Sequence, residues 1–153
     1  MRLTLTNEIH YSRRNTDHHV CYELRVQETS VWCVAASVQM LLDFYRYNYL
    51  QTKIAQQLGL GTLANPNGLP YARVGDVVTQ LQVMSSNVIT AKILTSPTFY
   101  DFASEMDQNQ PMISFIPGHS RTVAGYTESL FVLLGLAASA GFWYMIPGPP
   151  TQV

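Results

Sequence analysis

The stretch from Gln27 to Tyr45, QETSVWCVAASVQMLLDFY, constrains this chain more than any other. Its apolar residues recur at the spacing of an α-helix buried along one face. They are Val31, Val34, Ala35, Val38, Leu41, Leu42 and Tyr45. Ser30 stands immediately before the first of them and is the predicted N-cap. The pattern therefore predicts one long buried helix that ends near Arg46–Tyr49.

Cys33 falls in the first turn of this predicted helix. Unpaired backbone N–H groups point outward there, and the helix dipole favours a negative charge. The thiolate is the nucleophilic form of cysteine, so the position suits a reactive thiol. Gln27 precedes Cys33 by six residues, which is enough chain to bring its amide beside the sulfur. The alternative is that Cys33 is a small buried residue of a core helix.

His119 is the second candidate, and it follows Cys33 by 86 residues. It comes directly after a Pro117-Gly118 turn and opens a predicted strand over Ser120–Tyr126. An imidazole facing a thiol can take its proton as a general base and return it as a general acid. The alternative is an ordinary polar residue after a turn.

These residues together resemble the papain-like cysteine peptidases. The run WCVAASVQMLLDFY, preceded by Gln27 and followed by His119 and a Gly-Tyr pair, is most similar to the small bacterial members. That branch includes secreted effector proteases of plant pathogens and relatives of the domains that trim double-glycine leaders. The resemblance covers roughly residues 20 to 150. It implies a two-lobed α+β fold and cleavage of a protein or peptide through a thioester on Cys33. It also implies His119 as the general base and Gln27 as an oxyanion donor.

The chain departs from the family at the residue that orients the histidine, usually an Asp or Asn on a later strand. No Asp or Asn follows His119, and Ile146 occupies the position before Pro147. Glu128 is the only later carboxylate, and Gln152 lies close to the end. Either another group orients the imidazole, or the domain is catalytically impaired and binds peptide or protein partners. A different acyl transfer at the same site, such as deamidation or transglutamination, is a third reading.

The order of elements, helices first and strands last, predicts an α+β protein with an N-terminal helical lobe and a C-terminal antiparallel sheet. Gly59–Ala72 is rich in Gly, Pro and Asn and is expected to be a loop that borders the substrate cleft. The other expected elements are an edge strand in Met1–Ile9, a polar loop over Ser12–His19, a strand over Cys21–Val26, a helix over Lys53–Leu58 capped by Thr52 and stopped by Gly59, a helix capped by Asp76, a strand over Val88–Leu94, a helix opened by Ser96-Pro97, and a strand over Met112–Ile116.

Leu130–Ile146 contains seventeen residues without a charge. This is just long enough for a membrane span, or it can form two buried strands, Leu130–Leu136 and Phe142–Ile146. No basic flank anchors a membrane helix, so the sequence favours the hairpin.

The length of 153 residues predicts a single domain over residues 1–153. A net charge of −1 gives no electrostatic case for binding nucleic acid or an anionic membrane. Only 12% of the residues are charged, which points to an oligomer or to a partner protein. Two cysteines, Cys21 and Cys33, are too few for a disulfide framework, and a bond between them is left open. A free Cys33 suits a reducing compartment.

A metal site at Asp17-His18-His19-Val20-Cys21 is disfavoured, because adjacent histidines point apart on a strand and no second cluster completes the ligand set. No glycine motif that would cradle a phosphate is present, and no cofactor is expected. Met1–Val20 has no apolar core and does not resemble a secretory signal. The expected location is the cytoplasm, or export by a route without a classical signal peptide.

Overall fold

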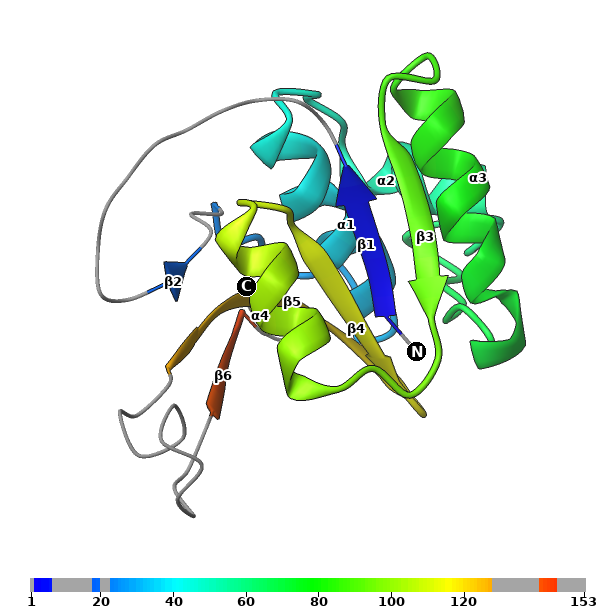
Figure 1. Ribbon diagram of the computed structural model, residues 1–153. Helices are drawn as coiled ribbons and strands as arrows, with labels where there is room; N and C mark the ends of the chain where they lie inside the picture. The colour runs from blue at the N-terminus through cyan, green and yellow to red at the C-terminus, as the bar shows by residue number, and fades with distance from the viewer. Residues whose placement is uncertain (1, 7–17, 20–22, 128–140, 146–153) are drawn as a thin grey trace, which may run out of the picture.

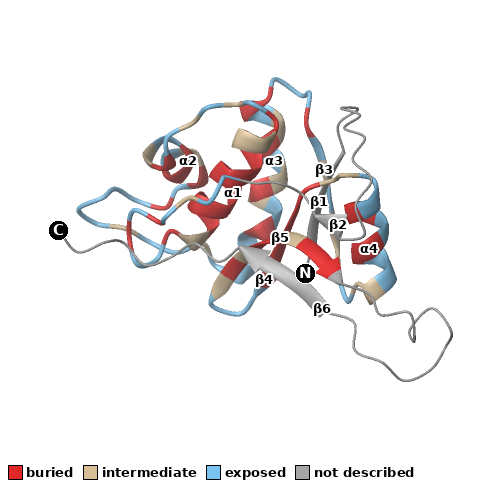
Figure 2. Cartoon of the chain, turned by 90° about the vertical axis from the view of Figure 1, so that its left-hand side faces the viewer, coloured by how far each residue is buried: buried red, intermediate tan, exposed pale blue. Residues whose placement is uncertain are grey.

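A computed structural model describes residues 2–6, 18–19, 23–127 and 141–145, with side chains over 23–126. The predicted α+β class is confirmed, because helices pack on both faces of an antiparallel sheet (Figures 1 and 2). The helices are α1 (Cys33–Phe44), α2 (Gln51–Leu58), the 3-10 turn η1 (Tyr71–Arg73), α3 (Val74–Met84) and α4 (Phe99–Asp107). The strands are β1 (Arg2–Thr6), β2 (His18–His19), β3 (Thr90–Leu94), β4 (Met112–Ile116), β5 (His119–Thr127) and β6 (Gly141–Met145).

The sheet has the order β2-β5-β4-β1-β3, and β6 also pairs with β5. Thr122 of β5 pairs with Ile113 of β4 and with Met145 of β6, so these two strands lie on opposite edges of β5. The prediction that the first strand lies at an edge is wrong. β1 lies between β4 and β3, because strands made much later in the chain pair with both of its edges (Figure 1).

Two further predictions near the N-terminus are wrong. Residues 23–26, the described part of the predicted strand Cys21–Val26, have no regular structure. Gln51 of α2 donates a hydrogen bond to the Val26 carbonyl, and the side chains of Leu24 and Val26 are exposed. His18–His19, predicted as the end of a loop, instead forms β2 and pairs with Tyr126 and Gly125 of β5.

The strand predicted over Phe142–Ile146 is confirmed, one residue earlier, as β6. Its partner is β5. The other half of the predicted hairpin, Leu130–Leu136, lies outside the described residues. Among the described residues, no helix is both long enough and apolar enough to cross a membrane.

Helix α1 is buried on all sides, and not along one face as predicted. Every residue from Val34 to Leu42 is buried, because the sheet covers one side of the helix and α2 and α3 cover the other (Figure 2). The helix also begins later than predicted. Thr29 accepts a hydrogen bond from the Val31 N–H in a turn before the helix, so Ser30 is not the N-cap and Val31 lies outside the helix.

The other helix boundaries follow local signals with small differences. Gly59 ends α2 in a left-handed conformation (φ +66°), as predicted, but α2 begins at Gln51, before the predicted cap. Asp76 lies inside the first turn of α3 and does not cap it. Helix α4 begins at Phe99, after the predicted Pro97, because Thr98 and Asp101 form a reciprocal capping box.

Tyr45, which follows α1, predicts a loss of stability at alkaline pH. Burial raises the pKa of its phenol well above the ordinary value of about 10, and the negative charge of Glu105 raises it further. The fold therefore prefers the uncharged phenol, so its contribution is complete below pH ~10 and is lost as pH rises above that value. The free energy of unfolding is expected to fall by up to about 1.4 kcal/mol per pH unit there.

Urea titrations between about pH 8 and pH 11 check this alkaline loss. Tyr45→Phe keeps the ring and should be less sensitive to pH than the wild type. Tyr100→Phe, at an exposed position, should behave like the wild type. Equal slopes for wild type and Tyr45→Phe would contradict the assignment.

Candidate active site

Cys33 is the first residue of α1, and its thiol is free and partly exposed. The backbone N–H groups of the first helical turn have no partner within the helix, and Trp32, at the N-cap, makes no side-chain cap bond. The N-terminus of α1 therefore offers backbone N–H donors beside the sulfur nucleophile of Cys33. Cys21, the other cysteine, lies outside the described residues.

His119 is the first residue of β5, directly after the Pro117-Gly118 turn, and it is partly exposed. Gly118 has φ +79°, a conformation that favours glycine, so the chain can turn tightly immediately before β5 begins. The sequence prediction of a strand opened by this histidine is confirmed by the structure, whereas its role as a base stays a prediction.

Helix α1 and strand β5 pack together with their starts at the same end. Near those starts, the Ser37 and Ser120 hydroxyls lie 3.2 Å apart and are fully buried. At the other end, Phe44 packs against the cluster that contains Tyr126. Ser37 lies one turn, about 6 Å of rise, after Cys33, and Ser120 is the residue after His119. The packing therefore brings the two candidates to the same region of the molecule.

Gln27 lies in the irregular segment before α1 and is 8% exposed. Its Oε1 atom is buried and has no hydrogen-bond partner among the described residues. An unsatisfied buried acceptor of this kind costs about 1–3 kcal/mol. The Oε1 atom of Gln27 therefore keeps unused capacity to accept a hydrogen bond.

Comparison with protein families decides the class. Residues 18–134 match the family model described as "Peptidase_C39 like family", and this match covers most of the chain. The chain belongs to this family. Membership supports a hydrolase of the cysteine peptidase class, as the sequence resemblance predicted. Comparison with curated proteins and with solved structures gave no match.

A base of this kind works best when a carboxylate or amide orients its ring. The described residues after His119, through Thr127 and from Gly141 to Met145, include no Asp and no Asn. Ile146, Glu128 and Gln152 lie outside the described residues. The structure therefore gives no carboxylate or amide from β5 or β6 for this task.

Within the described residues, no three His, Cys, Asp or Glu side chains come together as a metal site would require. The segment Asp17 to Cys21, which the sequence disfavoured as a metal site, lies mostly outside the described residues. Only the backbone of His18 and His19 is described there.

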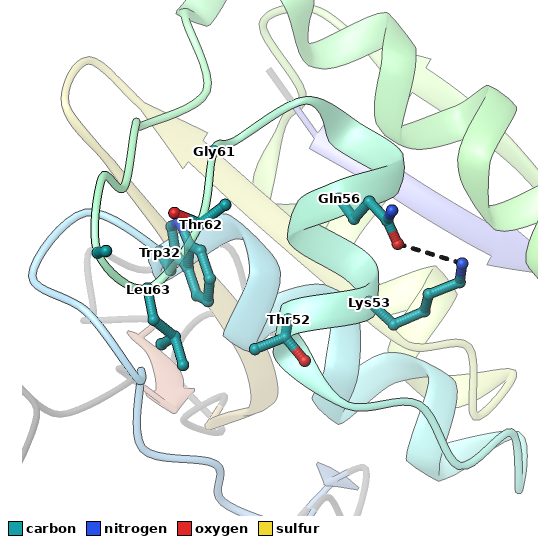
Figure 3. A pocket seen from close by; sticks show the side chains of 8 residues that line it. Trp32, Thr52, Lys53, Gln56, Gly61, Thr62 and Leu63 are labelled. Carbon is teal, nitrogen blue, oxygen red and sulfur yellow. Dashed lines mark hydrogen bonds between the residues drawn. The ribbon is translucent and has the colours of Figure 1, made fainter.

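A pocket of about 500 Å³ adjoins the start of α1 (Figure 3). Trp32, the residue before Cys33, lies at its back and donates its indole N–H to the Leu60 carbonyl at 3.0 Å. Gly61 has φ +76°, and a Cβ there would lie 2.2 Å from the Asn65 carbonyl oxygen, so the loop needs glycine. The remaining lining residues are Thr52, Lys53 and Gln56 of α2 and Thr62, Leu63 and Ala64 of the loop.

The predicted loop Gly59–Ala72 thus supplies one wall of this pocket. Its role as a border of the substrate cleft stays a prediction, because Cys33, His119 and Gln27 are not among the lining residues.

Sequence reasoning missed a set of buried polar side chains around the candidates. Ser37 and Gln39 are buried in an otherwise apolar helix, and Gln51 is buried at the start of α2. The signal in the sequence was a serine and a glutamine inside the apolar run of α1. Their partners, Ser120 and Gln51, lie far away in the sequence and could not be read from it.

Proposed function

We propose that this protein is a papain-like cysteine peptidase that cleaves a protein or peptide substrate through a thioester on Cys33. The sulfur attacks the scissile carbonyl carbon after His119 takes its proton. His119 then gives that proton to the leaving amine as the C–N bond breaks. Water hydrolyses the thioester, which releases the acid product and restores the thiol. The Gln27 amide and the Cys33 backbone N–H stabilise the negative oxygen in both steps.

One observation carries the proposal: Cys33 and His119 are the first residues of two elements that pack in parallel and share the Ser37–Ser120 contact. A nucleophile at a helix N-terminus and a base at the start of the adjacent strand are the minimal pair for acyl transfer when the two side chains come within hydrogen-bond reach. Family membership supports the same chemistry. The free thiol suits a reducing location, either the cytoplasm or a cell entered after export without a classical signal.

A second candidate is a catalytically impaired domain that binds peptides or a partner protein. The absence of any Asp or Asn after His119 favours it. Loss of the orienting residue usually lowers activity without removing the nucleophile or the oxyanion donors, so the peptidase remains the better-supported function.

A labelling experiment tests the proposal. The wild type, Cys33→Ala and Cys21→Ala are incubated with a peptidyl chloromethyl ketone and, separately, with a library of fluorogenic peptide amides. Wild type and Cys21→Ala should cleave at least one peptide and become alkylated at Cys33, and Cys33→Ala should do neither. Peptide binding with an inert Cys33 would overturn the peptidase in favour of the binder. Mass spectrometry of the products separates cleavage from deamidation or transglutamination.

A further inference from the structure

Two hydrogen bonds join the side-chain amide of Gln51 to the segment that carries Gln27. Its Nε2 donates to the Val26 carbonyl at 2.7 Å, and its Oε1 accepts from the Glu28 N–H at 3.0 Å. These two groups belong to the peptide units on either side of Gln27. Gln51 is 2% exposed, so water does not compete for these bonds.

Holding both peptide units fixes the point and direction from which the Gln27 side chain leaves the backbone. The φ and ψ angles of Gln27 are the rotations that relate one of these units to the other. Once both units are bonded to a single amide, these angles are set, and so is the Cα–Cβ bond of Gln27. Gln51 therefore sets where the Gln27 side chain begins without contacting that side chain.

The same amide is tied to the helix that begins at Cys33. The second N–H of Gln51 Nε2 donates to Oε1 of Gln39 on α1 at 3.0 Å. Gln39 in turn donates to the Tyr49 carbonyl at 2.8 Å. One set of hydrogen bonds thus connects the segment around Gln27, the start of α2, and helix α1.

We propose that Gln51 is a positioning residue that holds Gln27 in register with Cys33 so that both donors meet the oxyanion. The inference rests on the proposed function and assigns a residue that the sequence did not indicate. Gln51 does not contact substrate in this account, since its donors and acceptor are already used. Its effect falls on stabilisation of the transition state and not on binding of the ground state.

Gln51→Met keeps the length of the side chain and removes all three hydrogen bonds. With a fluorogenic peptide amide selected by the wild type, kcat is expected to fall about 10- to 100-fold while KM changes less than about twofold. The concentration of active enzyme is set by titration with the peptidyl chloromethyl ketone, so loss of folded protein does not enter kcat. Gln57→Met, the same change elsewhere on α2, should keep the wild-type kcat.

A double variant separates positioning from a general structural role. If Gln51 acts through Gln27, then Gln27→Ala with Gln51→Met is no slower than Gln27→Ala alone. Additive losses, or a wild-type kcat in Gln51→Met, would overturn the inference. If Gln51→Met does not fold, Gln39→Met is judged by the same criteria, because it removes the hydrogen bond between Gln51 and α1. An inert wild type would instead refute the proposed function, so the two failures are distinguishable.

Discussion

Replacing His119 by alanine is expected to lower kcat/KM by a factor of about 10³ to 10⁶, and replacing Cys33 by alanine is expected to lower it as much. The thiol has no other proposed base, and the alanine at position 33 has no nucleophile. Because the two side chains perform one step together, the double variant should be no slower than either single variant. Initial rates on a selected fluorogenic peptide measure all three.

The rate at which iodoacetamide alkylates Cys33 is an independent test of the pair formed by Cys33 and His119. At neutral pH, alkylation of Cys33 should be much slower in His119→Ala than in the wild type, because the thiol loses the group that accepts its proton. Val83→Ala, an exposed change on α3, serves as the control and should react like the wild type. Equal alkylation rates in wild type and His119→Ala, with cleavage retained, would remove His119 from the mechanism.

Trp32→Ala is expected to lower the free energy of unfolding by about 3–5 kcal/mol. The Trp32 side chain is completely buried in the core cluster between α1, α2 and the loop after α2. Its removal leaves a cavity at the point where the chain enters α1. Urea denaturation with a constant m-value measures the loss.

Trp32→Phe is the matched control. It keeps an aromatic ring but loses the hydrogen bond to the Leu60 carbonyl, which still accepts from the Asn67 N–H at 2.8 Å. Because that carbonyl stays paired, the lost bond should cost only about 0.5–1.5 kcal/mol, to which the smaller ring adds. A Trp32→Ala variant as stable as the wild type would show that this residue does not hold the loop against α1.

The sequence could predict elements whose signals are local. β4 coincides with its predicted range because Met112–Ile116 is a mostly apolar run bounded by Pro111 and a Pro-Gly turn. The end of α2 at Gly59 was also predicted correctly, because a glycine after an apolar-periodic segment is a local signal for a helix end. The position of β1 could not be predicted, because the alternation of a strand does not reveal its partners. The burial of α1 on all sides was also missed, since it depends on layers contributed by distant elements.

The residues of the candidate site also divide into those that local sequence signals predict and those that only the tertiary fold reveals. Cys33 and His119 could be named because a cysteine near the start of a buried helix and a histidine at the start of a strand are local signals, although α1 begins two residues later than predicted. Gln51 could not, because nothing local distinguishes it from Gln56 or Gln57 of the same helix. Only the tertiary fold shows that it alone among them bonds both sides of Gln27.

The central place of β1 in the sheet has a consequence for how the chain folds. Its neighbours β3 and β4 follow it by roughly 85 to 110 residues, and among the described strands β3 pairs with β1 alone. Such distant pairings slow folding, because the closure of a long loop precedes any gain from the contact. A nascent chain cut short before β4 could pair β1 with β3 but would leave the other edge of β1 exposed to its neighbours on the polysome.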